Sequence, residues 1–278
     1  MPVVTVSWEL GSEGDRIARG LAERLGARLM DNAALSEAAR EYDAPGMRAG
    51  APELAERAPS FMERLNEERR RYNALLRAVI YRFAAEGNCV LLGLGGGMLL
   101  REVRHVLKVR TMAPRELRIQ RLMAAPPSGS PLTHAQAEDT VRRSDRDRGR
   151  HIRYLFNVDW ADPAPYDLVV NTRTIAAASA VEVIATLAAR PEFQPGGESG
   201  VILLDLALAS QVEATLMHDP NVWVDNLRVS SRGGDVILAG QVLAEEDRDL
   251  AEAATRRVAA VQVVRNEIVV QPPPLTGM

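Results

Sequence analysis

The sequence is almost without lysine. Of its 34 basic residues a single one, Lys108, is a lysine, and the others are arginines. Any site that binds phosphate in this chain must therefore be made almost entirely of arginine side chains and backbone N–H groups. Cysteine is equally scarce: Cys89 alone excludes an internal disulfide, and its place in the apolar run CVLLG indicates a small buried side chain.

Other absences exclude further classes of protein. No apolar run reaches the roughly 18 residues that a membrane helix needs, so we expect no membrane span. The N-terminal residues show no basic region with a small-residue cleavage site, and we expect a cytoplasmic location. The four histidines show no metal-ligand spacing, which predicts no metal site. The net charge of −3 gives no general attraction to nucleic acid.

What the sequence does contain is a glycine-bearing turn close to its start. The apolar run Val3–Val6 leads into Gly11-Ser12-Glu13-Gly14, and apolar residues then recur at helical spacing. A turn of this kind presents the first N–H groups of a helix to an anion. The lysine and hydroxyl of a complete phosphate-binding loop are missing, because Asp15 and Arg16 follow Gly14. Nucleotide binding and an ordinary tight turn both fit this pattern.

Strand and helix patterns alternate over the first 190 residues. A capping box at Ser60 and Glu63 predicts the start of a long helix. Apolar runs predict a buried strand at Cys89–Leu92, followed by a second glycine turn over 93–97, and further strands at about 105–112 and 167–171. This alternation predicts a doubly wound parallel sheet with helices on both faces, in which ligands gather at the carboxyl ends of the strands.

The most charged stretch is RRSDRDRGRHIR, residues 142–153, with six arginines and two aspartates. It reads either as a solvated helix face or as an arginine lid that closes over phosphates, since guanidinium groups bind phosphate oxygens in pairs. Binding of RNA fits less well because no aromatic residues are interleaved for base stacking. We therefore expect no nucleic-acid partner.

The C-terminal part has a different character. Residues 191–200 have the Pro, Gly and Glu content of a linker. Beyond them we predict a short helix over 212–217, a strand over 222–229, a hairpin at Gly233-Gly234, a strand over 235–242, a helix over 245–258 and a strand over 261–270. This pattern predicts a small α+β domain over 201–272, with 273–278 as a tail.

Four segments of the first part resemble the cytidylate kinase-like family, a branch of the nucleoside monophosphate kinases. They are SWELGSEGDRIARGLAERLG, RLMDNAALSEAA, NCVLLGLGGGMLL and SDRDRGRHIRYLFNVDWADPAPYDLVVNT. The resemblance implies a P-loop kinase-like fold over 1–190, binding of ATP with Mg²⁺, and phosphoryl transfer to a nucleoside monophosphate, with CMP as the acceptor that the family suggests. Residues 201–271 resemble a BON domain through GGDVILAGQV and VQVVRNEIVV, although Ala260 replaces that domain's usual glycine.

The resemblance also implies which residues form the site. The nucleotide-binding residues would be Gly11, Ser12, Glu13, Gly14, Asp15, Arg16, Asp31, Gly93 and Gly95. The catalytic lid arginines would come from Arg143, Arg146, Arg148, Arg150 and Arg153, and Glu9 and Asp15 are acids that could help hold magnesium.

Three positions depart from the family pattern. Trp8 and Leu94 stand where the family tends to have arginine, and Glu13 stands where it has glycine. Two functions therefore remain: an active phosphotransferase, or a catalytically weak or inactive nucleotide sensor that acts through its BON-like domain. The expected partners are nucleotides, a protein or lipid-like ligand of the BON-like domain, and a second copy in a homo-oligomer.

Overall fold

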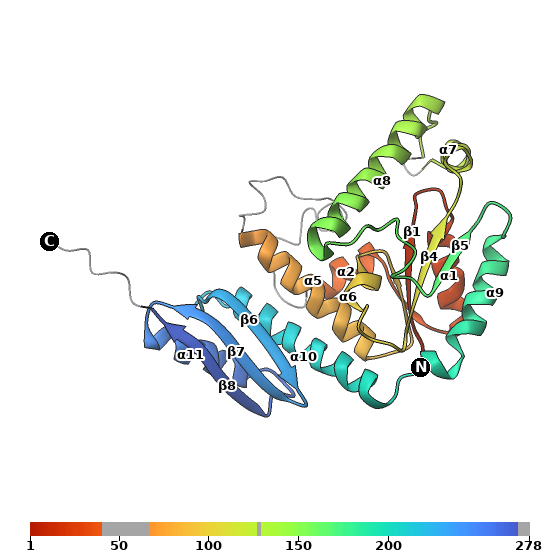
Figure 1. Cartoon of the computed structure of the whole chain (residues 1–278). Coiled ribbons are helices and arrows are strands. Elements are labelled where there is room, and N and C mark those ends of the chain that lie inside the picture. The colour runs from red at the N-terminus through yellow and green to blue at the C-terminus, as the bar shows by residue number, and fades with distance from the viewer. Residues whose placement is uncertain (41–66, 127–128, 272–278) are drawn as a thin grey trace. The chain divides into compact units, whose positions relative to one another are not determined.

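A computed structural model describes residues 1–40, 67–126 and 129–271 (Figure 1). The chain divides into two compact units. The first contains residues 1–36 and 87–196, and the second contains the helix α5 (Glu67–Ala85) and the chain from Gly197 onward. The predicted capping box at Ser60 and Glu63 lies outside the described residues.

The first unit is built on a five-stranded sheet in which every neighbouring pair is parallel. Its strands, in the spatial order β2-β3-β1-β4-β5, are β2 (Arg28–Met30), β3 (Cys89–Leu92), β1 (Val3–Trp8), β4 (Val106–Met112) and β5 (Leu168–Asn171). After β1 the chain forms β2 and β3 on one side of that strand, and then β4 and β5 on its other side. The strand order therefore reverses at β1. In open sheets a ligand crevice forms at such a point, outside the carboxyl ends of the strands.

Helices cover both faces of this sheet. On one face α1 (Gly14–Leu25) and α9 (Ala177–Ala188) bury Ile17, Leu21 and Ile184 against Val4 and Val6 of β1. On the other face lies the short helix α6 (Gly96–Leu99), which contacts β1. The remaining elements of the unit are α7 (Arg115–Ala124), α8 (His134–Phe156) and the single turn η2 (Pro191–Phe193), and the first half of α2 (Asn32–Arg40) also belongs to it.

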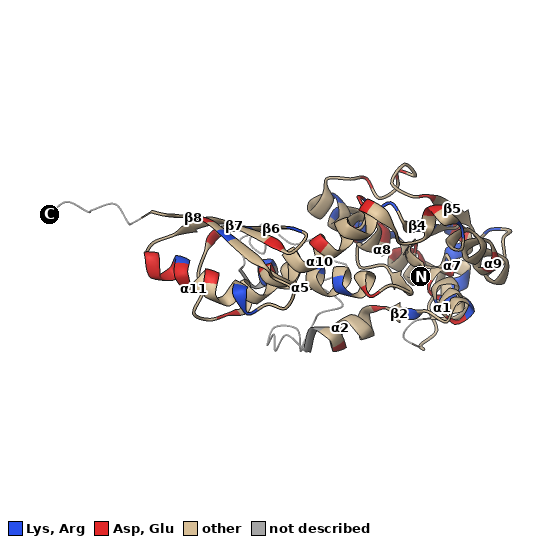
Figure 2. Ribbon diagram, turned by 90° about the horizontal axis from the view of Figure 1, so that it is seen from below, with Lys and Arg blue, Asp and Glu red and all other residues tan. Residues whose placement is uncertain are grey.

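The second unit pairs two helices with a small sheet. Helix α10 (Gly197–His218) packs against α5, and an ion pair of 2.7 Å joins Arg77 of α5 to Glu213 of α10. The sheet has the order β6-β7-β8, with β6 (Asp225–Arg232) antiparallel and β8 (Val263–Val270) parallel to β7 (Asp235–Val242). Helix α11 (Glu245–Arg256) begins with three acidic residues, which favour a helix N-terminus (Figure 2).

Helix α10 corrects the prediction of a short helix at 212–217. It runs for 22 residues and begins inside the stretch predicted as a linker. Helical periodicity failed here because the segment is apolar all round. By length and composition alone, the stretch Pro191–His218 could cross a membrane, a test that the core helix of a globular unit also passes. Within the second unit α10 contacts α5, β6 and α11.

The predicted fold class is confirmed: a doubly wound parallel sheet is followed by a small α+β unit. The boundaries 1–190, 191–200 and 201–272 stay predictions. Helix α5 groups with the second unit although it precedes β3 in the chain.

One strained residue lies just before β8. Ala260 has φ of 70°, in the left-handed region that costs a residue with a Cβ atom about 1–2 kcal/mol. We expect Ala260→Gly to stabilise the second unit by about 0.5–1 kcal/mol, because relief of strain exceeds the added entropy of the unfolded chain. Ala259→Gly is the control, since its backbone is not left-handed and it gains no such relief. Thermal unfolding measures both, and an equal or lower stability of Ala260→Gly would contradict the strain.

Candidate functional site

The turn between β1 and α1 lies at the carboxyl end of the central strand. Within it the Ser12 N–H donates to the Glu9 carbonyl at 2.9 Å, and the Ile17 N–H donates to the Glu13 carbonyl at 2.9 Å. The N–H groups of the residues before Ile17 in α1 have no acceptor inside the helix. The turn therefore presents N–H groups and the positive end of the helix dipole to an anion.

Two glycines of the turn are required by close backbone approach. Gly11 has φ of 84°, and a Cβ atom there would lie 2.8 Å from the Arg118 carbonyl oxygen. A Cβ atom on Gly14 would lie 2.3 Å from the Cβ of Trp8 and 2.6 Å from Oγ1 of Thr111. The turn thus packs directly on α7 and on the end of β1.

Glu13 places a carboxylate in this turn. Its φ is 60°, and it occupies the N-cap position of α1 without making a side-chain capping hydrogen bond. The side chain pairs instead with Arg121 and with Arg16, both at 3.2 Å. Glu13 is therefore a resident anion of the turn, and its charge is balanced by two arginines.

Arg121 connects the turn to the end of β5. Its guanidinium donates to the Gly11 carbonyl at 3.2 Å, to Oγ1 of Thr172 at 2.9 Å and to the Thr172 carbonyl at 2.8 Å. Oγ1 of Thr172 in turn donates to the Ser12 carbonyl at 3.1 Å. These bonds fix the carbonyl side of the turn, and the Arg121 Nη2 that donates to the Thr172 carbonyl also pairs with Glu13.

A buried chain of alternating charges lies beside the turn. Arg110 of β4 pairs with Glu9 at 3.0 Å, and Arg118 of α7 pairs with Glu9 at 3.5 Å. Arg118 also donates two hydrogen bonds to Asp145 of α8, at 2.9 and 2.7 Å. Burial lowers the pKa of Arg118, but the hydrogen bond and charge of Asp145 and the charge of Glu9 outweigh it and raise the pKa above its ordinary value.

Arg110 also lies between two aromatic rings. Its Cζ is 4.6 Å from the ring centroid of Trp160 and 5.7 Å from that of Tyr166, and it donates to the Trp160 carbonyl. Burial raises the pKa of the Tyr166 hydroxyl, against the opposing charge of Arg110. The hydroxyl thus stays protonated and donates to the Trp160 carbonyl at 3.3 Å.

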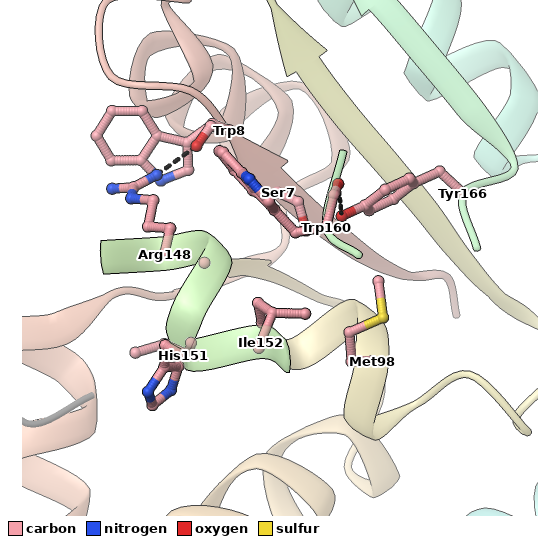
Figure 3. A pocket seen from close by; sticks show the side chains of 11 residues that line it. Ser7, Trp8, Met98, Arg148, His151, Ile152, Trp160 and Tyr166 are labelled. Carbon is pink, nitrogen blue, oxygen red and sulfur yellow. Dashed lines mark hydrogen bonds between the residues drawn. The ribbon is translucent and has the colours of Figure 1, made fainter. Parts of the chain in front are cut away.

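A pocket opens at the carboxyl ends of β1 and β3 (Figure 3). It encloses about 50 Å³, room for a few water molecules, and Arg148 of α8 points into it. Its lining residues are Ser7, Trp8, Gly93, Leu94, Gly95, Met98, Arg148, His151, Ile152, Trp160 and Tyr166.

Comparison with known protein families identifies the family to which this chain belongs. The cytidylate kinase-like family matches residues 3–174, and the BON domain matches residues 205–272. The chain belongs to the cytidylate kinase-like family. Its first part is therefore nucleotide kinase-like, and a BON domain follows. No curated protein matches the chain.

Several solved structures are similar to this family member at low sequence identity. An uncharacterized protein from Eubacterium ventriosum ATCC 27560 has a TM-score of 0.51 at 16% identity, over 68% of this chain and 100% of that chain. Shikimate kinase from Bacteroides thetaiotaomicron has a TM-score of 0.41 at 16% identity, over 67% and 97%. Shikimate kinase from Acinetobacter baumannii, in complex with shikimate, has a TM-score of 0.37 at 17% identity, over 67% and 92%.

In this cytidylate kinase-like protein one of the five expected lid arginines faces the pocket. Arg148 lines it, whereas Arg143, Arg146 and Arg153 pair with Asp139, Asp147 and Asp159, and Arg150 is exposed. These four arginines lie on an exposed face of α8, and their role as a lid stays a prediction.

The expected nucleotide-binding residues lie in different places in the structure. Gly11, Ser12, Glu13, Gly14, Asp15 and Arg16 form the β1–α1 turn and the first turn of α1, and Gly93 and Gly95 line the pocket. Asp31 does not join them. It caps α2 by accepting the N–H groups of Ala33 and Ala34, both at 3.0 Å.

The acids near the turn do not fit a magnesium ion. Glu9 is held by Arg110 and Arg118, and Asp15 is exposed in a charged cleft between α1 and α9. Over residues 1–40, 67–126 and 129–271, no three or more Asp, Glu, His or Cys side chains gather as a metal site. The donors present, N–H groups and arginines, fit a phosphate instead.

Sequence reasoning missed Arg110, Arg118 and Arg121, which surround the turn. Two signals could have found them. Arg110 is a charged residue within the buried strand VLKVRTM. Arg118 and Arg121 are spaced by three residues on the helix that follows that strand.

Proposed function

We propose that this protein binds a nucleotide at the β1–α1 turn and transfers its phosphoryl group weakly or not at all. The observation that carries the proposal is the carboxylate of Glu13, which lies in the anion-binding turn and is paired with Arg121 and Arg16. A phosphate that approaches the N–H groups of α1 meets this negative charge and must compete with it for both arginines.

Nucleotide binding is supported by the donors around the turn. The N-terminus of α1 attracts anions, and Arg121 and Arg118 approach the turn from α7. A bound nucleoside triphosphate would supply the phosphate that Arg121 pairs with in place of Glu13. The chain has neither the lysine nor the hydroxyl that usually completes such a loop, which supports weak transfer.

Such a protein would act as a sensor, in which the presence or absence of bound nucleotide is the signal. In this proposal the BON domain is the interaction module, and its ligand is a protein or a lipid-like molecule. The cytoplasmic location and the homo-oligomer stay predictions.

The second candidate function is phosphoryl transfer from ATP to a nucleoside monophosphate, with CMP as the first acceptor to test. The arginines near the turn favour it: Arg118 and Arg121 donate to its carbonyls, and Arg148 donates to the Trp8 carbonyl just before it. Phosphoryl transfer depends mainly on positioning and on neutralising charge, and arginines supply both.

Calorimetric titration of the whole protein with ATP, with and without Mg²⁺ and then with CMP, tests these functions when ADP release is assayed in the same sample. We expect binding without turnover. Glu13→Gln removes the charge alone, and Glu13→Gly also removes the left-handed strain. Both should bind ATP about tenfold more tightly, as expected when a like charge within a few ångströms is removed.

Glu23→Gln is the matched control, because Glu23 is an exposed acid on the same helix. It should bind ATP like the wild type. An equal affinity of Glu13→Gln and wild type would show that the carboxylate is no obstacle. Turnover by the wild type would establish the second function, and the absence of any ATP binding would remove both.

A further inference from the structure

Trp8 is the last residue of β1 and contacts both the β1–α1 turn and helix α8. The Cζ of Arg148 in α8 lies 4.2 Å from the ring centroid of Trp8. The same guanidinium donates a hydrogen bond to the Trp8 carbonyl (Figure 3). The indole thus holds a guanidinium at the entrance of the turn.

The backbone of Trp8 is fixed from the other side. Gly14 approaches so closely that a Cβ atom there would lie 2.3 Å from the Cβ of Trp8. Trp8 is also paired in the sheet with Thr111, whose hydroxyl shares a hydrogen bond of 2.9 Å with Ser12. A ligand that shifts Ser12 or Gly14 must therefore shift Trp8 as well.

We infer that Trp8 is a positioning residue that holds Arg148 on its ring, and that phosphate bound at the β1–α1 turn draws Arg148 off it. The inference rests on the proposed nucleotide site. A cation over an exposed or partly buried ring is held modestly, whereas a phosphate binds a guanidinium through charge-assisted hydrogen bonds. The guanidinium then has two alternative positions, and the ring competes with the phosphate for it.

This arrangement makes residue 8 a determinant of phosphate affinity. Trp8→Ala removes the ring but keeps the Cβ atom that Gly14 contacts. Its affinity for inorganic tripolyphosphate should rise about three- to thirtyfold, the factor that corresponds to the usual strength of a cation–π contact. Trp8→Phe keeps a smaller ring and should lie between Trp8→Ala and the wild type.

Tryptophan fluorescence observes the exchange directly. The chain has three tryptophans, and Trp160→Phe with Trp223→Phe leaves Trp8 as the single emitter. Without ligand, Arg148→Lys should change Trp8 emission because an ammonium does not stack as a planar guanidinium does. Arg142→Lys, an exposed arginine of the same helix, is the matched control and should leave the emission unchanged.

In the protein that keeps Arg148, tripolyphosphate should then shift Trp8 emission in the same direction as the Arg148→Lys substitution does. In the Arg148→Lys variant itself, tripolyphosphate should change the emission little. The inference is overturned if Arg148→Lys leaves the ligand-free emission unaltered. It is also overturned if calorimetry detects no tripolyphosphate binding, or binding without a fluorescence change. A response to tripolyphosphate without binding of ATP would support the inference and overturn the proposed nucleotide function alone.

Discussion

Replacing Arg118 by methionine should lower the unfolding free energy of the first unit by about 3 kcal/mol. The Arg118 side chain is 6% exposed, and its guanidinium is shared by Asp145 and Glu9. Without it, Asp145 loses both of its Arg118 hydrogen bonds, and Glu9 keeps its ion pair with Arg110 and its hydrogen bond from the Ala113 N–H. This loss lies at the lower end of the usual cost of breaking a buried ion pair. The Asp145 side chain is 32% exposed, so water can partly solvate its carboxylate once Arg118 is gone.

Arg115→Met is the matched control for this prediction. Arg115 joins the same two helices through an exposed ion pair of 2.9 Å with Glu138, and its loss should cost less than about 1 kcal/mol. Urea unfolding in a Trp223→Phe background reports on the first unit, since Trp8 and Trp160 both belong to it. Equal losses in the two variants would contradict a special role for the buried pair.

A double variant separates the lost pair from other damage. Asp145→Leu removes the carboxylate that Arg118→Met leaves behind, so the two losses should sum to more than the loss of the double variant. Strict additivity of the two single losses would mean that Arg118 and Asp145 do not stabilise each other.

The sequence predicts the strands and the glycine turn because those signals are local. Cys89–Leu92 is a continuous apolar run, Val3–Val6 is apolar apart from Thr5, and both segments are buried strands. The partners of charged side chains are not local. Glu9 pairs with Arg110, 101 residues away, and no spacing within either segment indicates that contact.

Asp31 shows how two local signals can compete. The resemblance placed it toward the acceptor nucleotide, but an aspartate just before a helix is also a common N-cap. The structure gives it the second role, with both hydrogen bonds to backbone N–H groups of α2. The capping role can be predicted because it depends on adjacent residues alone, while a place for Asp31 toward the acceptor nucleotide stays a prediction.

The arginines of α8 that were expected to form a lid differ in where their side chains point. Arg146 and Arg150 are four residues apart and are exposed, while Arg148 lies between them in sequence and points into the pocket. A charge count treats all of them alike. Their difference arises from the direction of each side chain around α8, which depends on how that helix packs against α7 and the rest of the first unit.

Gly14→Ala should destabilise the first unit by about 2–3 kcal/mol, although alanine favours a helix over glycine. The new Cβ atom would lie 2.3 Å from the Cβ of Trp8 and 2.6 Å from Oγ1 of Thr111. Neither neighbour can rotate away, because the first is attached to the backbone of β1 and the second shares a hydrogen bond with buried Ser12. The turn itself must therefore move.

Gly20→Ala in the same helix is the control. Its Cβ atom would meet Cγ2 of Val181 at 3.2 Å, a side-chain contact that small shifts relieve. The gain in helix propensity, about 1 kcal/mol, should roughly offset that contact and leave stability near that of the wild type. Urea unfolding in the Trp223→Phe background distinguishes the two variants. If Gly14→Ala unfolds at the same urea concentration as Gly20→Ala, the close approach to Trp8 is not what requires glycine at the start of α1.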